Sequence, residues 1–163
     1  MKPILILLMS AFALAGTARL GAPADPPAPA EDEPRPKTLF ERLGGTYVLA
    51  AVVDDFVDAL YTDPVVNARP AVKRALHTTR KAGLKFQTTS LLCEETGGPC
   101  KYDGRSLREA HRDLGLTTRE WNAAVAAFTR ALVRAKVPAA ERQELLNLLG
   151  TTKGDIVVAP AAK

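Results

Sequence analysis

Hydrophobic residues recur at steps of three and four along most of the chain, the spacing that keeps them on one face of an α-helix. No segment shows convincingly the two-residue alternation of a half-buried strand. One stripe comprises Leu49, Val52, Val53, Phe56 and Leu60. A second comprises Trp121, Val125, Phe128, Leu132 and Ala135. The pattern predicts an all-α domain of four substantial and two short helices, in which two antiparallel pairs pack on each other.

Three motifs mark helix starts by pairing Ser or Thr with a Glu three residues later, which is the capping-box spacing. The pairs are Thr38 with Glu41, Ser106 with Glu109, and Thr117 with Glu120. Glycine and proline mark most of the other helix ends. We predict that Thr46 caps a helix ending at Asp63-Pro64, and that other helices span 84–96 and 139–149. The segment 64–83 is weakly patterned, and only a turn of helix from Pro70 is predicted there.

Both ends of the chain lack a core pattern. Residues 1–15 join a basic start to an uncharged run that ends in Ala13-Leu14-Ala15, which predicts a signal peptide. An uncleaved membrane anchor is the alternative. Residues 16–36 form an Ala/Pro-rich linker, 37–157 the domain, and 158–163 a disordered tail. We expect an exported protein, periplasmic or secreted, with no membrane span in the mature chain.

The charge composition argues against a nucleic-acid partner. The chain has 22 Lys and Arg against 18 Asp and Glu, a net charge of only +4, and basic and acidic residues are interleaved without any run of five basic residues. Aromatic residues make up 6% of the sequence, too few to suggest a base-stacking surface.

Two cysteines, Cys93 and Cys100, flank a Gly-Gly-Pro turn. In an exported protein they are expected to form a disulfide, although two buried thiols are the alternative. A zinc site that adds His77 and His111 has none of the usual ligand spacings. Covalent c-type haem is excluded because Cys-x-x-Cys-His does not occur.

His111 is the residue with the most chemical interest. On its predicted helix it shares a face with Leu107 and Leu114, so it points inward. Spacing alone favours a core histidine that bonds to backbone or water over a metal ligand. A neutral imidazole against apolar walls is nevertheless suited to haem iron. His77 lies among polar residues and is expected to be solvated.

The order of several motifs resembles group I truncated haemoglobins. The matching segments are 43–45, 51–56, 96–102, 104–111, 114–121 and 154–157. The most specific part runs from Gly97-Gly98-Pro99 through Tyr102 and Gly104 to His111. The resemblance implies a two-over-two helical sandwich that holds one haem b noncovalently. It also implies that His111 is the proximal iron ligand, with the opposite side of the iron open to dioxygen, nitric oxide or carbon monoxide.

The same resemblance implies which side chains form the haem slot. They are Phe56, Leu84, Gln87, Thr88, Leu91, Leu92, Leu107, His111, Leu116 and Trp121. For the haem propionates it leaves Lys81, Lys85 and Arg105 as candidate partners. Relatives usually carry a tyrosine that bonds bound dioxygen where this chain has Val57. Gln87 and Thr88 are the candidate replacements, whereas Tyr61, one turn beyond Val57, is expected to fall short.

Three functions remain open from the sequence. The leading one is non-enzymatic binding of diatomic gases, with nitric oxide detoxification possible if an external reductase supplies electrons. The second is a six-coordinate electron-transfer haem protein in which His77, Gln87 or Lys85 occupies the sixth coordination position of the iron. The third is a helical interaction domain without a cofactor.

Overall fold

The computed structural model describes residues 35–157, and these contain α-helices, one 3-10 helix and no strands. The predicted signal peptide, the tail and nearly all of the linker lie outside the described residues. No helix within 35–157 has the length and apolarity needed to cross a bilayer. The elements are α1 (Leu39–Leu43), α2 (Thr46–Thr62), η1 (Val66–Ala68), α3 (Pro70–Thr78), α4 (Lys81–Glu95), α5 (Leu107–His111), α6 (Thr118–Arg134), α7 (Ala139–Thr151) and α8 (Lys153–Ile156).

All three predicted capping boxes are confirmed, at the starts of α1, α5 and α6. In each, the Ser or Thr oxygen accepts from a backbone N–H of the first turn while the Glu carboxylate accepts from the cap residue's own N–H. The start of α2 differs from the prediction. Its cap is Gly45, and Thr46 is already helical, because both Gly44 and Gly45 adopt positive φ to reverse the chain.

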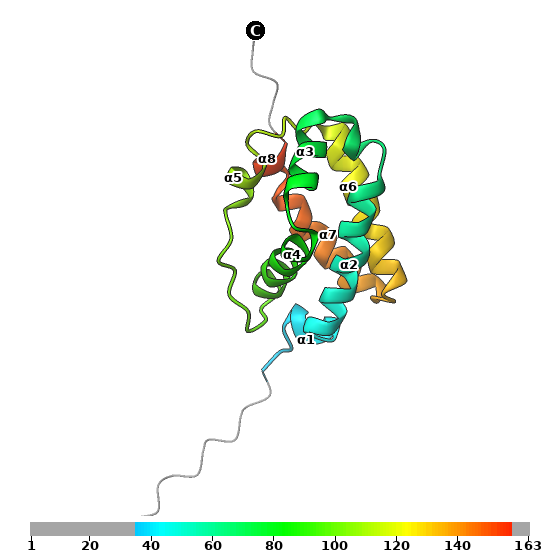
Figure 1. The fold of residues 1–163 in the computed structure, drawn as a ribbon. Coiled ribbons are helices and arrows are strands. Elements are labelled where there is room, and N and C mark those ends of the chain that lie inside the picture. Colours follow the sequence, from blue (N-terminus) through cyan, green and yellow to red (C-terminus); the bar gives the residue numbers. More distant parts are fainter. Residues whose placement is uncertain (1–34, 158–163) are drawn as a thin grey trace, which may run out of the picture. The chain divides into compact units, whose positions relative to one another are not determined.

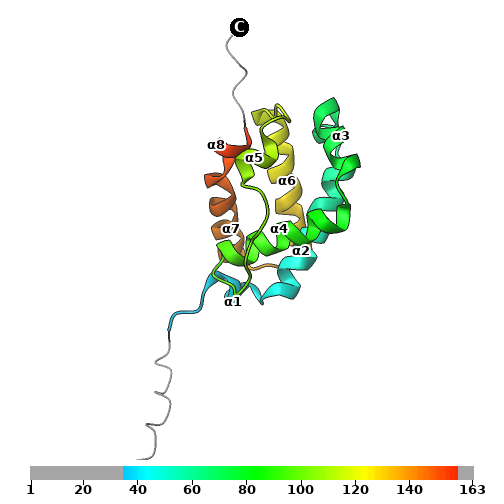
Figure 2. The ribbon, with the colours of Figure 1, turned by 60° about the vertical axis from the view of Figure 1, so that its left-hand side comes forward.

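The long helices form the two-over-two arrangement (Figures 1 and 2). Helix α2 packs against both α4 and α6, and α6 also packs against α7. The main core lies where these helices meet, and Phe56 of α2 contacts Phe128 of α6 edge-on with ring centroids 5.2 Å apart. Its buried members are Leu43, Leu49, Val52, Cys93, Phe128, Ala131, Leu132, Val137 and Leu145.

The structure also corrects one predicted helix start, extends one predicted turn to a full helix, and adds short helices that the sequence did not predict. Helix α4 begins at Lys81 rather than at residue 84, and ion pairs of Lys81 and Lys85 with Asp58 of α2 hold this first turn. The weakly patterned segment contains a full helix, α3, besides η1. Helix α8 was not predicted; it is four residues long and joins α5 through the pair of Arg108 with Asp155.

Candidate functional site

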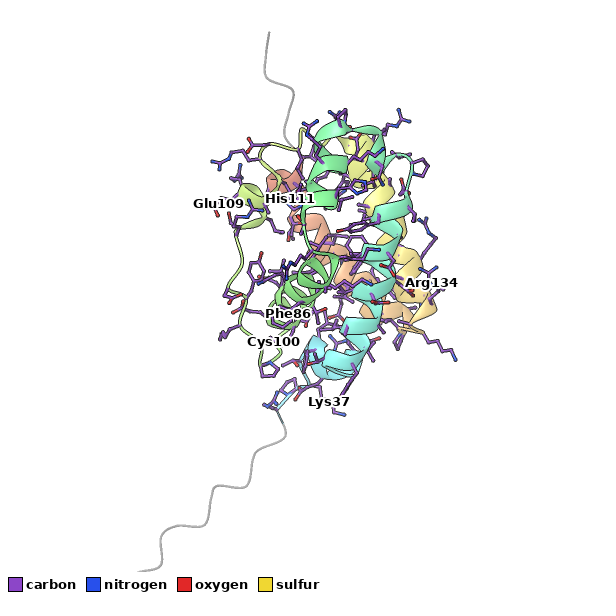
Figure 3. The ribbon with its side chains drawn as sticks, viewed as in Figure 1. Lys37, Phe86, Cys100, Glu109, His111 and Arg134 are labelled. Atoms are coloured by element: carbon purple, nitrogen blue, oxygen red, sulfur yellow. A yellow bond between two sulfur atoms is a disulfide. The ribbon has the colours of Figure 1, made fainter. Side chains whose placement is uncertain are left out.

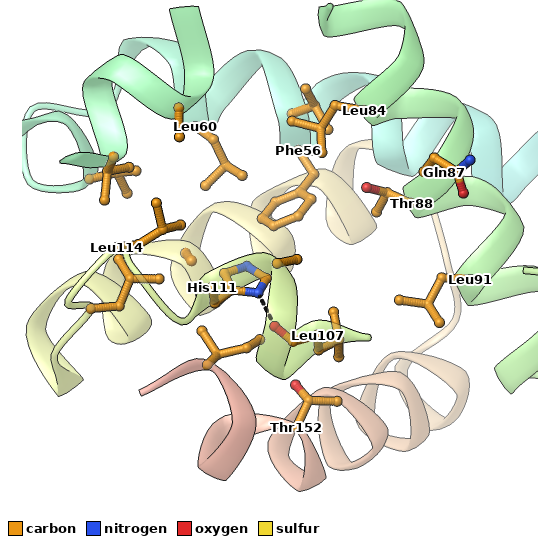
Figure 4. Close-up of a pocket in the computed structure, with 18 of the residues that line it drawn as sticks. Phe56, Leu60, Leu84, Gln87, Thr88, Leu91, Leu107, His111, Leu114 and Thr152 are labelled. Carbon is orange, nitrogen blue, oxygen red and sulfur yellow. Dashed lines mark hydrogen bonds between the residues drawn. The ribbon is translucent and has the colours of Figure 1, made fainter. Parts of the chain in front are cut away.

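A cavity of about 360 Å³ opens between α2, α3, α4, α5 and α6, with the C-terminal ends of α7 and α8 closing one side. Its walls are mainly aliphatic, with a few polar groups (Figure 4). Such a lining favours a large apolar ligand that is held by few polar contacts.

His111 stands at the C-terminal end of α5, and its ring lies in the cavity wall (Figures 3 and 4). Its Nδ1 is 2.7 Å from the carbonyl oxygen of Leu107. A carbonyl can only accept, so Nδ1 carries the hydrogen and donates it, which leaves Nε2 with a lone pair. Burial lowers the pKa of His111, outweighing the opposing effect of the bond to Leu107. The ring is therefore neutral and fixed in orientation, and its Nε2 lone pair is available to coordinate a metal ion.

Every residue that the sequence assigned to the slot lines this one cavity. They are Phe56, Leu84, Gln87, Thr88, Leu91, Leu92, Leu107, His111, Leu116 and Trp121. The sequence prediction missed the wall supplied by α3, namely Val72, Ala75, Leu76 and the adjoining Thr79. The steps of three and four from Val72 to Ala75 and to Leu76 were the available signal, but the segment 64–83 as a whole is weakly patterned.

The wall formed by α2 and α4 contains Val57, Gln87 and Thr88, which the family resemblance places on the distal side, where dioxygen would bind. Val57 is buried and lines the cavity, where it offers only methyl groups. In Figure 4 the hydroxyl of Thr88 points into the cavity beside Phe56, whereas the amide of Gln87 points away from it. The amide nitrogen of Gln87 donates to Asp103 at 3.1 Å, and its oxygen is buried without a partner among the described residues.

Tyr61 is excluded from distal chemistry by its own bonds. Its hydroxyl donates to the carbonyls of Leu76 and Thr79, at 2.8 and 3.2 Å, and so ties the end of α3 to α2. The ring also carries Lys81 over its face, with Nζ 4.3 Å from the centroid.

The structure distinguishes among the residues proposed to bind the haem propionates and those proposed as a second iron ligand. His77 is exposed on α3, and neither it nor Lys85 lines the cavity. Lys81 and Lys85 are paired with α2 carboxylates. Arg105 does line the cavity and makes no ion pair within residues 35–157.

The loop that leads to His111 is fastened along α4. Cys93 and Cys100 are joined by a disulfide with their Cα atoms 5.7 Å apart. The Glu94 carboxylate accepts from the backbone N–H of Tyr102 at 2.9 Å. Together with the bond between Gln87 and Asp103, these contacts fix the loop over two turns of the helix. The described residues bring no three metal-binding side chains together, so the zinc alternative finds no support.

Glu120, in the first turn of α6, is buried in the cavity wall. Burial alone would raise its pKa, but hydrogen bonds from the Thr117 hydroxyl and N–H, together with Arg69, lower it to about 2. Nε of Arg69 lies 3.2 Å from the carboxylate. This pair joins the segment before α3 to the start of α6.

A family model described as bacterial-like globin matches residues 38–158, which include all of the cavity. The chain belongs to the bacterial-like globin family. The globin resembles a group 1 truncated hemoglobin of Chlamydomonas moewusii, with 27% identity over 90% of this chain and 82% of the relative. It is 25% identical to a group 1 truncated hemoglobin of Tetrahymena pyriformis over 76% of this chain and 97% of that one.

Solved structures give the same fold for this globin. The truncated hemoglobin of Tetrahymena pyriformis, in its Fe(III) form, has a TM-score of 0.64 at 25% identity and covers 76% of this chain and 100% of its own. The hemoglobin of Chloroflexus aurantiacus has the same TM-score at 24% identity, covering 76% of this chain and 100% of its own. The all-α two-over-two fold and the family that the motifs indicated are thus confirmed.

Proposed function

We propose that this globin binds one haem b in the cavity, with Nε2 of His111 as the proximal iron ligand. The observation that carries the proposal is the oriented, neutral imidazole of His111 in the wall of an apolar cavity. Membership in the globin family supports it, since that family implies a haem cofactor. When bound, the haem supplies an iron atom that coordinates dioxygen, nitric oxide or carbon monoxide.

The residues present fit a haem. Aliphatic side chains from α4, α5 and α6 surround the cavity (Figure 4). His111 keeps its ring orientation through the Leu107 carbonyl, the kind of outer hydrogen bond that orients metal-ligating histidines. The disulfide and the contacts of Glu94 and Gln87 hold the loop that leads to α5 and His111 against α4.

Arg105 is the cation that we assign to a haem propionate. Of the three candidates from the sequence, it is the one that lines the cavity and is free of an ion pair within the described residues. Lys81 and Lys85 both form ion pairs with Asp58, and Lys85 also pairs with Asp54. A guanidinium suits a carboxylate because it can donate two parallel hydrogen bonds.

On the distal side, we assign the hydrogen-bond donor to Thr88. Its hydroxyl points into the cavity, whereas Asp103 holds Gln87 toward the loop and Val57 cannot donate. A single hydroxyl contributes about 0.5–1.5 kcal/mol to a bound ligand. A tyrosine at residue 57 would add a second donor to that of Thr88. We therefore expect dioxygen to dissociate faster from this globin than from the variant V57Y.

Gas binding is the function best supported by this arrangement. Nitric oxide detoxification would need an external reductase, and export to the periplasm or medium remains part of the proposal. The six-coordinate alternative is weakened because His77 and Lys85 do not line the cavity and Gln87 points away.

Haemin titration of the purified chain tests the proposal. We expect one equivalent to produce a Soret band, and the ferrous form to be high-spin and to bind carbon monoxide. Sharp low-spin bands without added ligand would instead establish the six-coordinate alternative. Absence of any Soret band would support a helical domain that needs no cofactor.

A further inference from the structure

The even mixture of charges along the chain breaks down between Asp63 and Glu94. This stretch contains six basic residues and no acidic one. They are Arg69, Lys73, Arg74, Arg80, Lys81 and Lys85. It includes the whole of α3, the connection to α4 and most of α4.

Half of these cations are neutralised by other helices. Arg69 pairs with Glu120 of α6, while Lys81 and Lys85 pair with carboxylates of α2. The other three, Lys73, Arg74 and Arg80, are exposed and have no carboxylate partner within residues 35–157. We call these three, with the exposed His77, the basic face of α3; Lys73, Arg74 and His77 lie on α3 itself, and Arg80 lies just beyond it, at the cap of α4.

The basic face covers the cavity from outside. The inner side of the same helix, with Val72, Ala75 and Leu76, forms part of the cavity wall. A protein bound to the basic face would therefore be separated from the cavity by one helix diameter, about 10 Å. Figure 2 shows α3 at the edge of the fold, beside α2 and away from α7 and α8, where a partner can approach it.

The basic face is also held in place. The Tyr61 hydroxyl bonds two carbonyls at the C-terminal end of α3, and Arg69 anchors the segment before its first turn to α6. A surface that is ordered before binding loses less conformational freedom when a partner docks.

We propose that the basic face of α3 is the docking site for an acidic electron-carrier protein that reduces the haem iron. The inference rests on the proposed haem site. One electron leaves the reduced carrier, which becomes oxidised, and the ferric iron gains it to become ferrous. Three unpaired cations attract and orient an acidic partner, and such steering raises association rates at low salt. A protein carrier is favoured over a membrane because the face lies directly over the cavity.

Stopped-flow reduction of the ferric globin by an acidic plant-type ferredoxin under carbon monoxide tests the proposal. The variant K73E/R80E reverses two charges of the face. The matched control K37E/R130E reverses the charges of one Lys and one Arg that are also exposed and unpaired within the described residues. Lys37 lies at the opposite end of the fold from His111 (Figure 3). Calorimetric binding of oxidised ferredoxin to each ferric protein gives a second readout that does not depend on turnover.

We expect K73E/R80E to lower the second-order rate constant and the affinity at least tenfold at low ionic strength, and the control to change both less than twofold. Salt should remove most of the difference, because it screens the exposed charges. Equal rates and affinities for the two variants, each with a normal Soret band, would overturn the docking site and leave the haem site intact. Loss of anionic-vesicle binding in K73E/R80E with unchanged ferredoxin reduction would overturn it in favour of a lipid surface. A wild-type chain without a Soret band would overturn both proposals.

Discussion

Breaking the Cys93–Cys100 bond is expected to lower the stability of this globin by an amount set mainly by the size of the closed loop. The cysteines are seven positions apart, so the loop contains eight residues. The chain-entropy relation gives about 8 cal/mol/K for such a loop, or about 2.5 kcal/mol at 25 °C. Residues 35–157 number 123, for which the unfolding entropy is about 260 cal/mol/K. The expected fall in Tm is therefore about 10 °C.

Thermal unfolding followed by far-ultraviolet circular dichroism measures this effect. Because Cys93 is fully buried, the chain should be reduced in denaturant and refolded with reductant present. The control is C93A/C100A, whose Tm should be the same with and without reductant. A shift below about 2 °C in the wild type would show that the bridge constrains neither the unfolded chain nor the loop that leads to His111.

Three further outcomes are expected. V57Y should slow dioxygen release about fivefold to tenfold, since a tyrosine hydroxyl in this wall adds about 1–1.5 kcal/mol; an unchanged rate in flash photolysis would show that residue 57 does not face the ligand. T88V should speed release about twofold to twelvefold, and the inward-pointing hydroxyl would lose its assigned role if the rate stayed the same. E120Q should lower stability by about 1.5–3 kcal/mol at neutral pH. The Glu120 pKa of about 2 lies below its ordinary 4.5, so its contribution is complete above pH 4.5 and lost toward pH 2. Urea unfolding between pH 2 and pH 4.5 should show that the unfolding free energy of E120Q depends less on pH than that of the wild type. The same pH dependence in both proteins would show that Glu120 is not the group responsible.

Local signals in the sequence were sufficient for several elements. The capping boxes at Thr38, Ser106 and Thr117 involve contacts only three residues apart, so the helix starts could be read directly. The stripes of α2 and α6 likewise predicted which faces are buried, because helical spacing alone decides which side chains share a side.

Tertiary contacts decided what the sequence could not show. Helix α4 gains its first turn from ion pairs of Lys81 and Lys85 with α2, partners that lie more than twenty residues away. Helix α8 is too short to form without its neighbours and packs against both α5 and α7. The identities of the cavity residues came from the family resemblance, whereas the inward direction of Thr88 and the pairing of Gln87 with Asp103 required the fold.

The central claim is that His111 ligates the iron through Nε2. The most direct measurement is the haem spectrum of H111G with and without added imidazole, compared with that of the wild type. We expect H111G to take up haem weakly and to lack the wild-type ferrous carbon monoxide spectrum, and we expect imidazole, which can occupy the space left by the side chain, to restore it. An H111G spectrum identical to that of the wild type in the absence of imidazole would show that His111 does not ligate the iron.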